Sequence, residues 1–258
     1  MNGIENRVVV VTGGARGQGR VEAQQLADAG AKVVVADVLE PEGALPNGAL
    51  YRRLDVTSQG AWTALADELA AEFGSVFGLV NNAGIVGARG RAGRLEEITL
   101  DDWNKLLEIN TTGPFLGIQT MSRLMTDGGS IVNISSIAGA GAHLAAGYGV
   151  SKWALRGLSR IASMELGPRN IRVNSILPGY IESPMQNQTP QSFIDAYLSI
   201  IPLGRVGNAT DVASLVTFLM SDGASWISGV DIPVDGGLLG HAGLRVISDA
   251  MTAATGGA

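Results

Sequence analysis

Short apolar runs alternate along this chain with segments in which apolar residues recur at helical spacing. The apolar runs cover residues 7–12, 32–37, 76–81, 129–135 and 171–177, and the helical patterns cover 61–73, 103–125 and 153–166. An uninterrupted apolar run of this length is typical of a strand buried on both faces of a parallel sheet. Strands that alternate with helices predict an α/β fold, a doubly wound parallel sheet covered by helices on both faces.

Length and composition are consistent with a single sheet of this kind. The chain has 258 residues, of which 46% are hydrophobic and 16% are charged, so it is long enough to bury a substantial core. The sequence contains no internal repeat and no low-complexity linker. We therefore expect residues 1–258 to form one domain.

The charge pattern argues against two classes of partner. A net charge of −6 is opposite to the basic face that a nucleic-acid partner needs, and Arg89, Arg91 and Arg94 form the one local basic run, which we interpret as a solvated loop. Neither a run of eighteen apolar residues nor a signal peptide is present in the sequence. We expect a soluble, cytoplasmic protein without a membrane partner.

The residue inventory also limits the chemistry. The chain has no cysteine, which excludes disulfides and thiol catalysis. Its two histidines, His143 and His241, are far apart in sequence and are not accompanied by clustered carboxylates, so no metal site is predicted.

A glycine-rich loop follows the first apolar run directly. Gly13, Gly17 and Gly19 mark the loop, and apolar residues at helical spacing follow from Val21 to Ala27. Glycines let a backbone turn sharply and approach a ligand, and the free N–H groups at a helix start favour a diphosphate. The segment predicts a dinucleotide site, although this spacing departs from a strict G-x-G-x-x-G and is also compatible with an ordinary tight turn.

The second apolar run ends in Asp37, eighteen positions after Gly19. A carboxylate at about this distance accepts both ribose hydroxyls of NAD and repels the extra phosphate of NADP. Val38 supplies no cation for that phosphate, whereas Arg16 in the loop is within reach of one. The pattern favours NAD over NADP, with a simple strand-end turn as the alternative for Asp37.

Tyr148 and Lys152 stand four residues apart at the start of a predicted helix, so their side chains leave the helix on one face. A phenol near its usual pKa of about 10 is a poor base at neutral pH. An ammonium held beside it favours the phenolate and allows proton exchange with an alcohol. The pair therefore predicts an acid/base for alcohol and ketone chemistry.

Further blocks accompany the glycine loop and this pair. They are Asn81-Asn82-Ala83-Gly84, Glu108-Ile109-Asn110-Thr111, Ile134-Ser135-Ser136-Ile137-Ala138-Gly139, the segment 172–179 and Val234-Asp235-Gly236-Gly237. In this order the motifs resemble the short-chain dehydrogenase/reductase family over nearly the whole chain. The resemblance implies a Rossmann-type sheet of about seven strands, an NAD-dependent alcohol dehydrogenase or ketone reductase, and a homotetramer.

The resemblance also implies roles for four catalytic residues. Tyr148 is the general acid/base, and Lys152 lowers its pKa and bonds the nicotinamide ribose. Ser136 donates to the substrate oxygen and stabilises the charge that develops there. Asn110 holds a water that links Lys152 to bulk solvent. The family spacing of thirteen residues before the tyrosine points to Ser135, but the match of Ser-x-x-Gly to Gly139 favours Ser136.

Cofactor contacts follow in the same way. Asp55 accepts from the adenine amine, Val56 adds its backbone N–H, and Ile181 with Ser183 meets the carboxamide; Ser183 stands where the family more often has threonine. The full predicted set is Gly13, Arg16, Gly17, Gln18, Gly19, Asp37, Val38, Asp55, Val56, Asn82, Ala83, Gly84, Tyr148, Lys152, Pro178, Gly179, Ile181 and Ser183.

Residues 179–204 are expected to form a substrate lid, because apolar side chains there are interrupted by prolines. Plain packing against the sheet or a neighbouring subunit is the alternative. The candidate substrate contacts are His143, Leu144, Tyr180 and Met185, and the most similar family members suggest a cyclic apolar alcohol such as a steroid or terpenoid.

Two other functions stay open: an NADP-dependent 3-oxoacyl-carrier-protein reductase, and a dinucleotide-binding regulator without turnover. The tail after Gly237 has two interpretations, a subunit contact or a frayed end.

Overall fold

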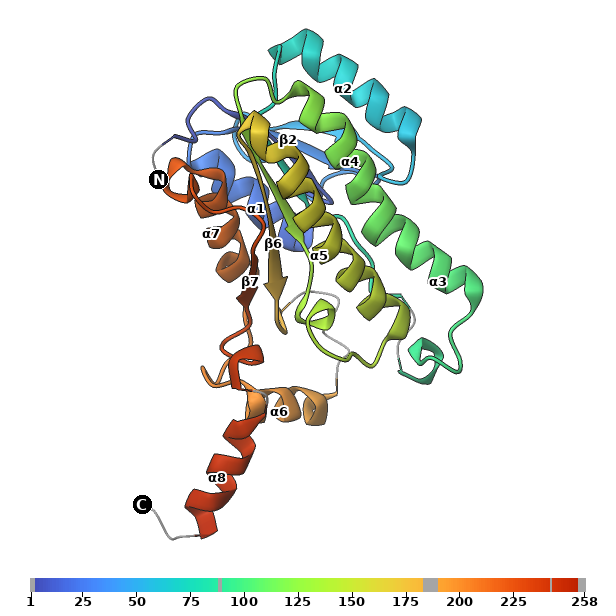
Figure 1. The fold of residues 1–258 in the computed structure, drawn as a ribbon, viewed down its shortest axis with the longest axis vertical. Coiled ribbons are helices and arrows are strands. Elements are labelled where there is room, and N and C mark those ends of the chain that lie inside the picture. Colours follow the sequence, from blue (N-terminus) through green and yellow to red (C-terminus); the bar gives the residue numbers. More distant parts are fainter. Residues whose placement is uncertain (1–2, 88–89, 183–189, 242, 255–258) are drawn as a thin grey trace.

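A single seven-stranded parallel sheet organises the molecule (Figure 1). The computed structural model describes residues 3–87, 90–182, 190–241 and 243–254. The strands pair side by side in the order β3-β2-β1-β4-β5-β6-β7. Their bounds are β1 (Val8–Thr12), β2 (Lys32–Asp37), β3 (Leu50–Arg53), β4 (Gly78–Asn81), β5 (Gly129–Ile134), β6 (Ile171–Pro178) and β7 (Asp231–Val234). Every pairing is parallel, which confirms the expected fold class.

Helices cover both faces of this sheet. Their bounds are α1 (Gly17–Asp28), α2 (Gln59–Phe73), α3 (Leu100–Leu107), α4 (Gly113–Met121), α5 (Ala146–Leu166), α6 (Gln191–Ile200), α7 (Ala209–Met220) and α8 (Leu244–Ala254). Figure 1 shows α1 and α7 on one side of the strands and α2, α4 and α5 on the other. Among the described residues, no helix combines the length and the apolar character needed to cross a membrane.

The strand β1 explains why the sequence builds two cores. Successive side chains of a strand point to opposite faces. Val8 and Val10 accordingly join the core under α2, α4 and α5, whereas Val9 and Val11 join the core under α1 and α7. All of β1 is buried, which its run of four valines suits. Its last residue, Thr12, is buried with its hydroxyl donating to the Val80 carbonyl.

The two edge strands are absent from the apolar runs. The edge strand β3 is largely half-exposed and ends in Arg52 and Arg53, and β7 contains Pro233. An edge strand has one neighbour and one open side, so it tolerates polar residues and proline that a central strand excludes. The predicted helical pattern 103–125 begins inside α3, three residues after its start, and continues through a π-helical turn (Glu108–Thr112), α4 and a 3-10 turn (Ser122–Leu124).

The predicted lid contains one helix. α6 begins after Pro190 and contacts α8, and these two helices lie apart from the layered body in Figure 1. Residues 244–254 form α8, and the last four residues of the chain, 255–258, lie outside the described residues. Ser183, Met185 and Arg89, which the sequence analysis singled out, lie outside the described residues.

Candidate active site

The predicted site residues gather at the carboxyl edge of the sheet. Connections leave β1 toward β2 on one side, and β4 lies on its other side, so the order of strands reverses between β1 and β4. Ligands of open α/β sheets bind in the crevice at such a reversal. The glycine loop follows β1, Asp37 ends β2, and Asn82 follows β4 directly.

The glycine loop is shaped to leave space at the start of α1. Gly13 has a φ of 66°, and a Cβ added there would lie 2.8 Å from the Cα of Ala83. A Cβ on Gly19 would lie 2.4 Å from the carbonyl oxygen of Gly13. At Gly17, with φ of 57°, no atom lies within 4 Å of the corresponding position. The loop is closely packed at Gly13 and Gly19 and open at Gly17, which leaves room for a diphosphate at the start of α1.

Asp37 fastens this loop to the end of β2. Its carboxylate is 8% exposed, Oδ2 accepts the N–H of Ala15 at 3.0 Å, and Oδ1 accepts the N–H of Leu39 at 3.0 Å. Each oxygen of a carboxylate has a second lone pair, so these bonds leave acceptor capacity for a ribose. The next residue, Val38, is 44% exposed and uncharged.

A cavity of about 530 Å³ brings two predicted adenosine contacts together. Val38 and Asp55 both line it, and the other lining residues are Thr57, Asp101, Asn104, Lys105, Glu108 and Ile109. Asp55 Oδ1 accepts from the backbone N–H and hydroxyl of Thr57 at 2.9 and 2.7 Å. The sequence analysis missed the wall contributed by α3 and the π-helical turn. The helical spacing of Asp101, Lys105 and Glu108 was the available signal.

The segment Asn81–Gly84 supports the glycine loop from β4. Asn82 Nδ2 donates to the carbonyls of Thr12 and Gly13 at 3.0 and 3.1 Å. Thr12 Oγ1 accepts the N–H groups of Asn82 and Ala83, both at 3.1 Å. These side-chain contacts place Asn82 behind the loop, where it holds the loop's shape.

The structure distinguishes the two candidate serines. Ser135 Oγ donates to the backbone carbonyl of Lys152 at 2.9 Å and is buried under α5. Ser136 lies at the start of the following 3-10 turn, where its Oγ accepts the N–H of Ala138, and its side chain interacts with the Tyr148 hydroxyl. Ser136 is therefore the serine next to Tyr148.

Burial governs the electrostatics of Tyr148. Removal from water raises the pKa of the Tyr148 phenol, the hydrogen bond with Ser136 opposes this increase, and Tyr197 adds to it. Lys152 Nζ donates to the carbonyl of Ile134 at 2.8 Å and lies 5.8 Å from the centre of the Tyr148 ring. The sequence predicted that Lys152 lowers the Tyr148 pKa, whereas in this structure the Tyr148 pKa is raised. Desolvation is the largest influence on the Tyr148 pKa, and Lys152 is not among the groups that shift it.

Lys152 itself is perturbed by its surroundings. The side chain is 4% exposed, and burial lowers the pKa of Lys152 to about 8. At neutral pH this ammonium is still mostly charged, and it sits beside Asn110. A Cβ added to Gly84 would be 3.1 Å from Asn110 Oδ1 and 3.5 Å from Lys152 Nζ.

Asn110 lies fully buried in the π-helical turn, an element often found at functional sites. Its Oδ1 accepts the N–H of Ile85 at 2.9 Å, and its Nδ2 donates to the Ile85 carbonyl at 2.9 Å and to Ser151 Oγ at 3.0 Å. Both amide hydrogens are thus used within the protein. The side chain connects the loop after β4 to α5, and the proton-relay role stays a prediction.

Aromatic side chains lie on the far side of Tyr148. The His143 ring is 5.5 Å from the Tyr148 ring. Tyr180 stacks on Tyr197 with centroids 4.9 Å apart, and Phe193 lies 5.9 and 5.0 Å from these two rings. Tyr197 also raises the Tyr148 pKa, so it links this aromatic cluster of Tyr180, Phe193 and Tyr197 to the surroundings of Tyr148. Leu144, also predicted here, is 67% exposed.

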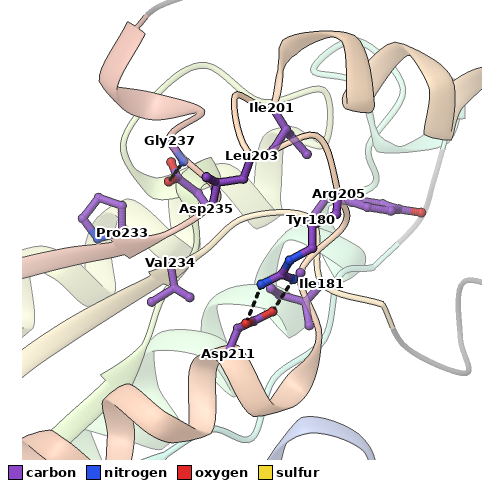
Figure 2. Close-up of a pocket in the computed structure, with 12 residues that line it drawn as sticks. Tyr180, Ile181, Ile201, Leu203, Arg205, Asp211, Pro233, Val234, Asp235 and Gly237 are labelled. Carbon is purple, nitrogen blue, oxygen red and sulfur yellow. Dashed lines mark hydrogen bonds and ion pairs between the residues drawn. The ribbon is translucent and has the colours of Figure 1, made fainter.

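A second cavity lies behind the segment that follows β6 (Figure 2). Its volume is about 270 Å³, and its lining includes Ile181, Ile201, Pro233 and Asp235. Figure 2 shows the Tyr180 ring pointing away from the strand end that carries Pro233. Ile181 lines this cavity and packs against the core under α1 and α7. Its expected contact with the carboxamide stays a prediction, as do the backbone contacts of Pro178 and Gly179.

Comparisons with known proteins agree with this arrangement. A family model described as "Enoyl-(Acyl carrier protein) reductase" matches residues 13–239. The 3-alpha-(or 20-beta)-hydroxysteroid dehydrogenase of Mycobacterium tuberculosis is 41% identical, covering 90% of this chain and 88% of the relative. Trans-4-hydroxycyclohexanecarboxylate dehydrogenase of Sinomonas cyclohexanicum is 40% identical over 91% and 93% of the two chains. The crystal structure of levodione reductase superposes with a TM-score of 0.84 at 31% identity, covering 90% and 97%.

Proposed function

This chain belongs to the short-chain dehydrogenase/reductase family, and from that membership we propose that it interconverts a secondary alcohol and a ketone with NAD. Members of this family are oxidoreductases that use a nicotinamide dinucleotide as cofactor. The observation that carries the proposal is the half-buried Tyr148, with Ser136 at its hydroxyl and Lys152 over its ring. These groups lie at the sheet edge that also carries the open glycine loop.

The chain's own residues supply the proton chemistry. In the oxidising direction the phenolate of Tyr148 accepts the hydroxyl proton of the alcohol. Ser136 donates to the same substrate oxygen and orients it, and the Lys152 ammonium, held by the Ile134 carbonyl, offsets the phenolate charge. The glycine loop and Asp37 would hold the dinucleotide, which would supply the hydride acceptor for the carbinol carbon. Ketone reduction is the reverse, with Tyr148 as the acid.

The environment of the adenosine ribose supports NAD over NADP. Asp37 places a buried carboxylate at the end of β2, and the exposed Val38 beside it offers no cation. Three acidic residues, Asp55, Asp101 and Glu108, line the neighbouring cavity, against one cation, Lys105. An additional phosphate would meet net negative charge there.

The aromatic cluster supports a cyclic apolar alcohol as substrate. Tyr180, Phe193 and Tyr197 form a cluster of flat rings, one of which, Tyr197, is close enough to act on the Tyr148 pKa. Flat apolar rings bind ring systems through dispersion and exclusion of water. The names of the two relatives and of levodione reductase are consistent with ring-bearing substrates. We propose that residues 179–204 close over this substrate.

The alternative of a carrier-protein reductase receives less support from the site. Such an enzyme is expected to show basic docking residues near the active site and to prefer NADP. Arg91, in the arginine run, pairs with Glu97 at 3.1 Å, and the carboxylate of Asp37 disfavours NADP. By family membership we also propose a cytoplasmic homotetramer. Exposed apolar side chains on α5, namely Trp153, Ile161 and Met164, support subunit association.

The test is turnover of cyclic alcohols and ketones, followed by nicotinamide absorbance with NAD and NADP in parallel. We expect a higher kcat/KM with NAD. Tyr148→Phe removes the hydroxyl and should lower kcat by at least about 100-fold, while NADH binding, measured by fluorescence, is retained. Full activity of Tyr148→Phe would refute the assigned acid/base, and preference for NADP would refute the role of Asp37.

A further inference from the structure

Glu22, on α1, is a buried carboxyl group that the proposed chemistry does not use. The residue is 0% exposed. Oε1 accepts from Gln18 Nε2 at 3.0 Å, and Oε2 has no hydrogen-bond partner in the described part of the chain. A buried ionised carboxylate normally needs several donors or a cation. The single donor at Glu22 fits a neutral acid better than a carboxylate.

This carboxyl group is connected to the glycine loop. Gln18 Nε2 also lies 3.4 Å from Asn82 Oδ1, and Asn82 Nδ2 donates to the carbonyls of Thr12 and Gly13. A Cβ on Gly19 would lie 2.3 Å from Asn82 Nδ2, so the cluster has no spare room. A change at Glu22 is therefore transmitted through Gln18 and Asn82 to the loop that receives the diphosphate.

Within the described ranges of the chain, no charged group compensates Glu22. The helix α1 packs against β1, β2 and α7. The titratable groups on these elements and on α1 itself are Lys32 and Asp37 of β2, Asp211 of α7, and Arg20 and Asp28 of α1. Asp37 accepts backbone N–H groups, Asp211 pairs with Arg205, Arg20 donates to the Ala44 carbonyl, and Asp28 accepts from Gln24. None of them shifts the pKa of Glu22, which burial raises to about 7.

We propose that Glu22 is a positioning residue of the dinucleotide loop that works as a neutral acid, and that binding of the diphosphate takes up a proton at its carboxyl group. In molecules whose Glu22 is ionised, the carboxylate takes this proton from the buffer acid as the complex forms, and the buffer acid becomes its conjugate base. The proposal rests on the proposed function only in placing a diphosphate at this loop, and it is independent of the reaction at Tyr148.

The expected coupling follows from the geometry of a helix. Glu22 lies five residues into α1, about 7.5 Å along the axis from its start. A carboxylate and one diphosphate charge about 10 Å apart, with an effective dielectric constant of about 20 to 40, change the binding constant by about 4- to 20-fold. Protonation of Glu22 removes this repulsion, so binding is expected to weaken about tenfold as the pH rises from 6 to 8.5.

The experiment is calorimetric titration with ADP-ribose, a diphosphate diester that has no group titrating in this pH range and carries no nicotinamide. For the wild type we expect the Kd to rise about tenfold between pH 6 and 8.5, with proton uptake near pH 8 in buffers of different ionisation enthalpy. Glu22→Gln should hold the pH 6 affinity throughout and take up less proton. The control Asp28→Asn removes an exposed charge from the same helix and should behave as the wild type does.

Three results would overturn the inference. They are a pH-independent Kd in the wild type, an absence of proton uptake near pH 8, and an unchanged pH dependence in Glu22→Gln. An absence of uptake in the wild type overturns the inference even if the variant fails to fold. Because Lys152 also titrates near pH 8, the proton is assigned to Glu22 by the loss of uptake in Glu22→Gln. Failure of ADP-ribose and NADH to bind at any pH would overturn the dinucleotide site as well. An active Tyr148→Phe would overturn only the proposed catalysis.

Discussion

The pH dependence of folding offers a separate test of the environment of Glu22. Burial raises the pKa of this carboxyl from 4.5 to about 7 in the folded protein. The folded state then binds a proton more tightly than the unfolded state, so the free energy of unfolding falls as the pH rises from about 4.5 to about 7 and is flat above. A difference of about 2.5 pKa units corresponds to about 3 kcal/mol.

Replacing Glu22 with Gln keeps the shape and the acceptor for Gln18 but removes the ionisation. The variant should match the wild type at pH 4.5 and exceed its stability by about 3 kcal/mol at pH 8. For a domain of this size that difference corresponds to a Tm about 6 to 12 °C higher. Calorimetry at pH 5, 6, 7 and 8 measures it, with Asp28→Asn as the control variant. Wild-type and Glu22→Gln melting temperatures that differ by the same amount at every pH would refute the reasoning.

Two further substitutions test the geometry of the site. Ser136→Ala should lower kcat at least about tenfold with NADH binding retained, because its hydroxyl meets the reacting oxygen. Ser135→Ala should instead lower the free energy of unfolding by about 1 kcal/mol, because it loses its hydrogen bond to the Lys152 carbonyl. The opposite pattern would assign the catalytic role to Ser135. Gly19→Ala places a Cβ 2.4 Å from the Gly13 carbonyl, so NADH fluorescence should show a Kd at least about tenfold higher. An unchanged Kd would contradict the close packing of the loop.

Periodicity predicted the centre of the sheet and missed its margins. Strands buried on both faces are mainly apolar, so β1, β2, β4, β5 and β6 are visible as apolar runs. The polar residues buried among them are hydrogen-bonded, as Asn133 and Ser175 are to Ser159. β3 and β7 pair on one side only, so Arg52, Arg53 and Pro233 are tolerated there and no local pattern marks them. These two strands form because they pair with a neighbouring strand in the folded sheet, and the local spacing of apolar residues does not reveal that pairing.

The candidate site shows the same division. Spacing brought Tyr148 and Lys152 onto one face of α5 and placed Asp37 at a strand end. It did not decide between Ser135 and Ser136. The alternation of side chains along a strand shows that these two point to opposite faces, but it does not show which of them points toward Tyr148. The sign of the Tyr148 pKa shift was also missed, since desolvation depends on burial by residues distant in sequence. Phe193 and Tyr197 join Tyr180 only through the folding of α6.

The double attachment of Asp37 restricts how coenzyme preference can be redesigned. Because its two oxygens hold Ala15 and Leu39 in place, exchanging it for a neutral residue would release the turn that receives the phosphates as well as removing the repulsive charge. Such a variant would lose affinity for both coenzymes instead of changing from one to the other. A route to NADP that preserves the turn therefore begins with a cation at the exposed neighbour, Val38, and leaves the acid intact.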